Sequence, residues 1–248
     1  MKNLLVKIMF DGRNYSGFQM QINAPTIQFE LEKAIQKITG SRCIVYGCSR
    51  TDSGVSANEY FFNFHTDSAI PAERVFHALN RHLPPAISAV SCTQVDENFH
   101  ARYHAIKKEY IYKIWNERIK NPFEHGFCHY YPYNLNDIIL NEECKSFIGT
   151  HDFSSFMSQN STVKTTVRTV YEAGMERDGS IVIFRVCADG FLYNMVRIMV
   201  GTLLKINEGR IKRGSIPQII EAKYRNSAGD TAPPYGLFLN KVYYSNMT

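Results

Sequence analysis

The sequence predicts an α+β fold built from two βαββαβ halves, residues 1–104 and 105–248. The chain has 248 residues, which is enough for two small domains with a sizeable core. Its composition, 44% hydrophobic and 21% charged, is that of a folded globular protein. The same order of strand-type and helix-type periodicity occurs twice along the chain. We expect the halves to form one continuous, mostly antiparallel sheet, with helices on one face and a basic cleft on the other.

The first half contains six predicted elements in the order βαββαβ. A helix is expected between Pro25, which opens it, and Gly40, which closes it. Its apolar face carries Ile27, Leu31, Ala34, Ile35 and Ile38. The other elements of this half are strands at 4–10, 42–47, 59–65 and 87–95 and a helix that begins at Pro71. This order is that of a ferredoxin-like unit.

The second half repeats this topology without repeating the sequence. Its predicted elements are strands at 108–116, 165–175, 180–187 and 237–244 and helices at 136–148, 191–206 and 215–225. We therefore expect a second ferredoxin-like half, with the boundary near residue 104.

Several classes of protein are disfavoured by the sequence. The six cysteines are scattered without a C-x-x-C pair, so we expect reduced thiols in the core. The N-terminal apolar run is too short for a signal peptide, and the apolar stretch 191–206 falls short of the ~20 residues of a membrane span. His100 and His104 are spaced like metal ligands on a helix, but they precede a predicted strand and lack acidic or cysteine partners. We expect a cytoplasmic protein without a metal.

Positive charge is concentrated in two segments of a chain whose formal net charge is +5. Residues 101–120 contain six Lys or Arg against two Glu, interleaved with three tyrosines and Trp115. Basic side chains beside aromatic rings are typical of proteins that bind a polyanion whose bases can stack on those rings, such as RNA. The alternative interpretation is that these basic side chains only form the solvent-exposed face of a strand. Residues 205–225 carry a second excess, again six basic residues against two acidic ones.

A loop at residues 48–55 is the first candidate for chemistry. It lies between two predicted strands, so Arg50 and Asp52 should project from an exposed loop. The sequence Thr-Asp-Ser-Gly is also ordinary turn chemistry, with Asp accepting local backbone hydrogen bonds. Both interpretations stay open on spacing alone.

The helix at 191–206 is the second candidate. Arg197 lies among apolar residues, with the small Gly201 one turn further on. A guanidinium in such a place needs a carboxylate partner, and Asp52 is our candidate. The alternative is that Arg197 pairs with another acid, or extends its guanidinium to solvent, for purely structural reasons.

Six segments resemble, in order, the motifs of the tRNA pseudouridine synthase A family. They are FDGRNYSGFQ at 10–19, SRTDSGV at 49–55, FHAR at 99–102, KEYIY at 108–112, GFLYNMVR at 190–197 and APPYGLFL at 232–239. The matches span nearly the whole chain, and the combination of Arg-Thr-Asp with Val-Arg is specific rather than generic.

The resemblance implies a cofactor-free isomerase that converts uridine to pseudouridine at positions 38, 39 and 40 of the tRNA anticodon arm. It assigns the catalytic carboxylate to Asp52, its guanidinium partner to Arg197 and an active-site ring that stacks on the target base to Tyr110. Whether Asp52 adds to C1′, attacks the ring or abstracts a sugar proton stays open. We expect the neighbouring Tyr112 to be a core residue.

The resemblance also implies how the RNA is held. Arg50 would help to flip the target nucleotide out of the stack. Plausible phosphate contacts are Lys107, Lys108, Arg102 and Arg13. The implied partner is the anticodon stem-loop of tRNA, bound by a homodimer.

Three positions depart from the family pattern. Ser49 stands where Gly is usual, Ser56 where His is common and Phe18 where Trp is usual. A divergent paralogue that modifies another RNA is therefore an alternative, as is a non-catalytic RRM-like RNA-binding module, although the RNP-type aromatic run is absent. A hydrolase with two carboxylates fits less well, because no second acid accompanies Asp52 in these motifs.

Overall fold

The computed structural model describes residues 1–159 and 163–245, and the chain divides into two compact units. The first unit holds residues 1–106 together with the chain from Phe238 on, and the second holds residues 107–237. The sequence placed the boundary near 104 and assigned the last strand to the second half. That strand groups with the first unit because Phe238 and Leu239 pair in parallel with Ser56 and Ala57.

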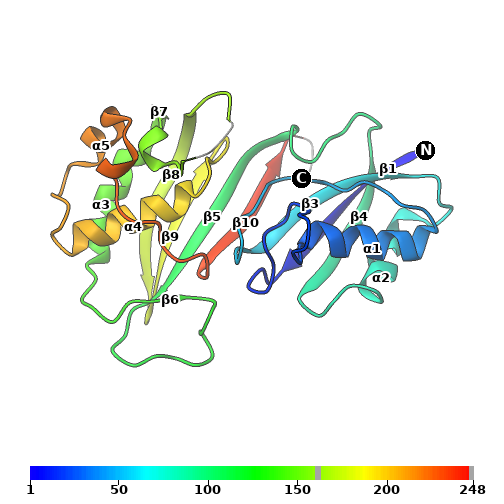
Figure 1. Cartoon of the computed structure of the whole chain (residues 1–248), viewed down its shortest axis with the longest axis horizontal. Coiled ribbons are helices and arrows are strands. Elements are labelled where there is room, and N and C mark those ends of the chain that lie inside the picture. Colours follow the sequence, from blue (N-terminus) through cyan, green and yellow to red (C-terminus); the bar gives the residue numbers. More distant parts are fainter. Residues whose placement is uncertain (160–162, 246–248) are drawn as a thin grey trace. The chain divides into compact units, whose positions relative to one another are not determined.

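The first unit has the predicted order of elements (Figure 1). These are β1 (Lys2–Phe10), α1 (Ile27–Thr39), β2 (Tyr46–Gly47), β3 (Ser56–Thr66), α2 (Ala72–Asn80) and β4 (Ile87–Val95), with β10 (Leu237–Tyr244) added from the end of the chain. Strand β1 lies between β3 and β4 and is antiparallel to both. Strand β2 pairs with Phe62 and Asn63 of β3 and is antiparallel to it. The resulting order β4-β1-β3-β2 confirms a mostly antiparallel α+β unit.

Helix α1 has the ends that its sequence predicts. The side chain of Thr26 accepts a hydrogen bond from the backbone N–H of Phe29, and Gly40 ends the helix at a left-handed φ of 77°. Ile27, Leu31 and Ile35 are fully buried. Helix α1 contacts α2, which contacts β4, so the apolar faces of both helices contribute to one core.

Strand β2 is shorter than the predicted strand at 42–47. The backbone N–H of Val45 donates to the Glu32 carboxylate at 3.3 Å, and its carbonyl accepts from the Gln28 amide at 3.3 Å. Because both side chains belong to α1, this part of the chain is bonded to a helix and not to a strand. Regular pairing begins only at Tyr46.

The second unit contains β5 (Ala105–Trp115), β6 (His129–Tyr130), α3 (Asp137–Cys144), β7 (Gly149–Asp152), β8 (Val167–Asp178), β9 (Ile181–Ala188), α4 (Met195–Asn207) and α5 (Ile216–Ala222). Strands β5, β9, β8 and β7 are neighbours in that order, and each adjacent pair is antiparallel. Helix α3 contacts both β8 and α4. The short strands β6 and β7 were not predicted.

Helix α4 begins at Met195, four residues later than the predicted start at 191. Asn194 has a left-handed backbone with φ of 60°, which an α-helix does not accommodate.

Of the helices in residues 1–159 and 163–245, none combines the length and apolar character that crossing a bilayer requires. The six cysteines are free thiols and all except Cys92 are buried, as the sequence predicts.

Candidate active-site elements

Asp52 lies in the loop between β2 and β3, as predicted. It is half-buried, whereas its neighbour Arg50 is exposed and Thr51 is buried. The loop therefore offers a half-buried carboxylate and an exposed cation within three residues, while Thr51 between them is buried. This is the arrangement expected of a functional loop on a rigid sheet.

The segment from Gly12 to Phe18 anchors this loop. The N–H of Phe18 donates to the carbonyl of Thr51 at 3.3 Å, and the N–H of Gly54 donates to the carbonyl of Tyr15 at 3.1 Å. The N–H of Gly12 donates to the buried Ser56 hydroxyl at 3.0 Å. Two motifs that are more than thirty residues apart in the sequence thus form one structure around Asp52.

Two glycines allow this close approach. A Cβ at position 17 would lie 2.5 Å from the carbonyl oxygen of Thr51, and Gly17 also has a left-handed φ of 91°. A Cβ at position 12 would lie 1.9 Å from the carbonyl oxygen of Val55. Any larger residue at either position would displace the backbone of the Asp52 loop.

The residues that depart from the family pattern support the loop. The Tyr60 hydroxyl donates to the carbonyl of Ser49 and lies 3.4 Å from the N–H of the same residue. The Phe18 ring stacks on Tyr60 with 4.5 Å between centroids. Ser56 is the acceptor for Gly12 described above. Tyr60 was not singled out in the sequence, because nothing in the alternation of β3 distinguishes it from other buried strand residues.

Arg197 lies on the first turn of α4 and is half-buried. Its Nε donates to the carbonyl of Ala232 at 2.7 Å, and its Nη1 donates to Oδ1 of Asn194 at 2.6 Å. These two bonds fix the plane of the guanidinium from two sides. The Ala-Pro-Pro segment and the GFLYNMVR segment therefore cooperate in holding one side chain.

Asn194 and Gly201 make that arrangement possible. Asparagine is one of the few residue types that tolerate a left-handed backbone, which Asn194 has. The Nδ2 of Asn194 donates to the Ser158 hydroxyl at 2.9 Å. A Cβ at position 201 would lie 1.8 Å from the carbonyl oxygen of Asp230. The absence of a side chain at Gly201 lets residues 229–232 cross α4 closely enough for Ala232 to reach Arg197.

The two tyrosines of β5 have different environments. Tyr112 is fully buried and its hydroxyl donates to the carbonyl of Pro233 at 2.9 Å. This burial confirms the prediction of a core residue, and it raises the pKa of the Tyr112 hydroxyl well above its ordinary value. The Tyr110 ring is 6% exposed and meets the Phe191 ring edge-on at 4.9 Å.

Comparison with known proteins decides the family. A sequence profile described as tRNA pseudouridine synthase matches residues 144–245. The tRNA pseudouridine synthase A of Acetivibrio thermocellus is 45% identical over 244 residues, covering 98% of this chain and 100% of that protein. The protein of the same name from Clostridium acetobutylicum is also 45% identical, with the same coverage. The chain belongs to the tRNA pseudouridine synthase A family.

The family assignment confirms the predicted enzyme class, an isomerase. Among solved structures, a Cbf5-Nop10-Gar1 complex contains a chain that aligns with 96% of this chain and 59% of its own length, at 12% identity and a TM-score of 0.36. That likeness is too distant to support a conclusion about the site.

The basic residues of this pseudouridine synthase A family member differ in their surroundings. Arg13 forms a bidentate ion pair with Asp11, with 2.7 Å between Nη2 and Oδ2. This pair lowers the pKa of the Asp11 carboxyl. Arg102 is exposed beside the Tyr103 ring, 5.9 Å from its centroid. Lys107 lies 3.8 Å from the Glu172 carboxylate, and Lys108 is half-buried.

These predicted contacts belong to both units. Arg13, Arg50 and Arg102 lie in the first unit with Asp52, and the two lysines lie in the second unit with Tyr110 and Arg197. Within the first unit, Asp52 and Arg50 share one loop. Within the second, Arg197 is accompanied by Asn194 and Ala232, whose roles the sequence did not reveal.

Proposed function

We propose that this chain is a tRNA pseudouridine synthase that isomerises uridine to pseudouridine at positions 38, 39 and 40 of the anticodon arm, without a cofactor. One observation carries the proposal: 45% identity to a tRNA pseudouridine synthase A over 98% of the chain. The rigid support of the Asp52 loop and of Arg197 agrees with a site that must hold charged groups in fixed positions.

The reaction breaks the bond between C1′ and N1, turns the uracil and joins C1′ to C5. The proton on C5 leaves and N1 gains a proton, so the product is an isomer of the substrate. In our proposal Asp52 supplies the negative charge that the electron-poor intermediate requires, as carboxylates do in glycoside chemistry. Addition to C1′, attack on the ring and abstraction of a sugar proton are the three courses open to it.

We assign to Arg197 the role of keeping Asp52 ionised in a site that excludes water. Desolvation would raise the pKa of a carboxyl, and a guanidinium opposes that rise by favouring the charged form. Support comes from the two hydrogen bonds that fix Arg197, because a pre-oriented fork loses little entropy when it meets a carboxylate.

The remaining roles concern the nucleotide. Tyr110 would stack on the extruded uracil and hold it after the glycosidic bond breaks, an interaction worth about 1 to 3 kcal/mol per base. Arg50 would fill the space that the base leaves, and its exposure on the catalytic loop supports this role. Arg102, Lys107 and Lys108 would contact phosphates, as would Arg13, although its pairing with Asp11 offsets its charge. The enzyme would act as a cytoplasmic homodimer.

The decisive experiment measures tritium release from tRNA labelled at C5 of uridine, with no added nucleotide or metal. Wild type should release tritium and Asp52→Asn should not, while both bind tRNA equally. Asp67→Asn makes the same chemical change at an exposed site of the same unit and should retain full activity.

Substrates with cytidine at 38, 39 or 40 assign the positions. Release that is unaffected by all three replacements would indicate a paralogue with another target, and a wild type that binds every tRNA without releasing tritium would indicate a non-catalytic RNA-binding protein.

A further inference from the structure

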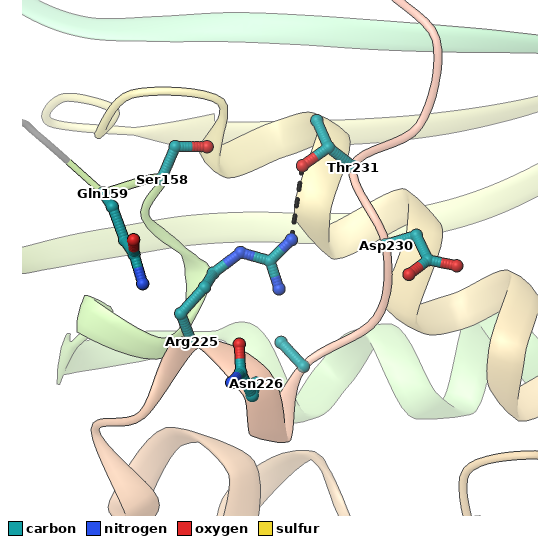
Figure 2. A pocket seen from close by; sticks show the side chains of 7 residues that line it. Ser158, Gln159, Arg225, Asn226, Asp230 and Thr231 are labelled. Atoms are coloured by element: carbon teal, nitrogen blue, oxygen red, sulfur yellow. Dashed lines mark hydrogen bonds between the residues drawn. The ribbon is translucent and has the colours of Figure 1, made fainter.

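The second unit contains a polar cavity that the proposed mechanism does not use (Figure 2). Its volume is about 550 Å³, and it is lined by Ser158, Gln159, Arg225, Asn226, Ala228, Asp230 and Thr231. All of these except Ala228 carry polar side chains. Arg225 also ends the second basic segment of the sequence, 205–225, for which no function has been assigned so far.

The guanidinium of Arg225 is half-buried, and its hydrogen-bond partners among the described residues are neutral. Its Nη1 donates to the carbonyl of Gly229 at 2.9 Å, and its Nη2 donates to the Thr231 hydroxyl at 3.2 Å. Within the part of the chain that the structure describes, no carboxylate lies within 4.0 Å of it. A guanidinium has five N–H donors and stays protonated, so this side chain presents a partly desolvated cation with donors to spare.

Asp230 does not neutralise this cation. Its carboxylate pairs with Lys205 at 2.9 Å, and Figure 2 shows the side chain directed away from Arg225. The pKa of Arg225 is lowered by burial, and the attraction to Asp230 opposes this only as a smaller effect. The cavity therefore favours an anion.

A hydroxyl donor accompanies the guanidinium in the lining. The Ser158 oxygen accepts a hydrogen bond from Nδ2 of Asn194, which leaves the hydroxyl proton of Ser158 for another acceptor. A planar fork of N–H donors beside a hydroxyl matches the several acceptor oxygens of a phosphate group.

We propose that this cavity binds a backbone phosphate of the substrate RNA. The identity of the ligand as RNA rests on the proposed function, whereas its chemistry as a phosphate rests on Arg225 and Ser158. The cavity also adjoins the groups that hold Arg197: Ser158 bonds to Asn194, and Thr231 precedes Ala232. A phosphate bound here would stabilise the residues on both sides of the catalytic guanidinium, so RNA binding would favour its working orientation.

The protein side of the test compares Arg225→Gln with Arg213→Gln. Both remove one positive charge from the same basic segment, but Arg213 is exposed and lies outside the cavity. Filter binding of tRNA across a salt series should show about tenfold weaker binding for Arg225→Gln, as expected for one charge-assisted contact, and a salt slope reduced by about 1. Arg213→Gln should match wild type. Equal behaviour of the two variants would overturn the proposal.

The RNA side of the test compares RNAs bound by the same protein, so a general loss of affinity in a variant does not obscure it. Anticodon-arm RNAs are prepared with one backbone phosphate at a time replaced by an uncharged methylphosphonate. At one position the replacement should weaken binding to wild type about tenfold and have no effect on binding to Arg225→Gln. If every replacement has the same effect on both proteins, no RNA phosphate occupies the cavity.

Calorimetry with inorganic phosphate separates the two sources of the ligand. One outcome would assign the cavity to a free phosphate and overturn its role in RNA binding. In that outcome inorganic phosphate binds to wild type but not to Arg225→Gln, while every methylphosphonate replacement in the RNA has the same effect on both proteins. A wild type that releases no tritium would refute the proposed function, but the binding comparison would still test the cavity.

Discussion

Gly201 and the carbonyl of Asp230 are in such close contact that a Cβ at position 201 would lie 1.8 Å from the carbonyl oxygen. The contact brings the segment 229–232 across α4, where the N–H of Ala232 bonds to the carbonyl of Arg197 at 3.1 Å and the N–H of Gly229 bonds to the Thr202 hydroxyl at 2.9 Å. The position of the Arg197 guanidinium therefore depends on a residue that has no side chain.

Gly201→Ala should both destabilise the protein and impair catalysis. The new methyl group meets backbone on a buried helix, so one of the two segments must move, at a cost of about 1 to 3 kcal/mol. The movement lengthens the bond from Arg197 to Ala232, and kcat for tritium release should fall more than tRNA affinity. In Gly174→Ala the new Cβ meets the amide oxygen of Asn141 at 3.2 Å and no backbone atom, so the loss of stability should be smaller and kcat should stay close to wild type. A fully active Gly201→Ala would contradict this account.

Gly17→Ala should impair catalysis through the Asp52 loop. The position combines a left-handed φ of 91° with a contact of 2.5 Å to the Thr51 carbonyl, so the substitution displaces the backbone next to Asp52. Gly40 also has a positive φ, but nothing lies within 4 Å of its Cβ position. Gly40→Ala should therefore lower the free energy of unfolding by about 1 kcal/mol and leave kcat unchanged. Equal losses of kcat in the two variants would show that strain, and not the loop contact, is responsible.

Much of the fold could be predicted because local signals agree with tertiary contacts. The predicted strands at 87–95 and 237–244 have the observed bounds of β4 and β10. The errors occur where side chains from elsewhere replace local pairing: Glu32 and Gln28 bond to the backbone of Val45, so β2 begins late. Strand β6 is only two residues long, too short to show a periodic pattern.

The site was predictable only in part, and for a related reason. The motifs point to Asp52, Tyr110 and Arg197, but they do not reveal which other residues hold these three side chains, or through which atoms. Nothing in the sequence indicates that the Tyr60 hydroxyl bonds to the backbone of Ser49, and Ala232 holds Arg197 through its backbone carbonyl and N–H alone. Backbone groups have no sequence signature, so contacts through them become visible only in the structure.

Asn194→Gly should lower kcat without a large change in the backbone. Glycine adopts the left-handed conformation at this position readily, whereas the acceptor for Nη1 of Arg197 is lost. A hydrogen bond to a charged group is worth about 1.5 to 3 kcal/mol, so a reduction in kcat of about tenfold or more is expected. Asn194→Ala should lose the same activity and additional stability, because alanine is strained at a φ of 60°. If kcat is equal to wild type in Asn194→Gly, Arg197 does not need this support.

Replacement of Lys107 and Lys108 by Gln should reduce the salt dependence of tRNA binding. Each lysine that neutralises a phosphate contributes about 0.9 to the slope of log affinity against log salt, so the double variant should lose about 2. Lys33 and Lys37 are exposed on α1, and their double replacement by Gln is the control for charge alone. An unchanged slope in the first variant would place the phosphate contacts elsewhere.

His129 should make the stability of the fold fall as the pH is lowered from about 6.5 to 5.5. Burial lowers its pKa, and among the described residues its Nδ1 atom is buried without a hydrogen-bond partner. In the unfolded chain its pKa is about 6.5. Above that value both states are neutral and no free energy is lost. As the pH falls below about 6.5, the unfolded chain takes up a proton that the native state does not. The free energy of unfolding therefore falls by up to about 1.4 kcal/mol per pH unit.

His129→Phe replaces the ring with one that does not titrate, and should weaken this pH dependence in urea unfolding at pH 7.5, 6.5 and 5.5. Some dependence should remain, because burial also lowers the pKa of His100. The same substitution at exposed His82 controls for the loss of an imidazole elsewhere. Carboxyl groups titrate mainly below this range, so they should not obscure the difference. If His129→Phe keeps the full pH dependence of wild type, His129 takes up its proton equally in the native and the unfolded chain, and this account is wrong.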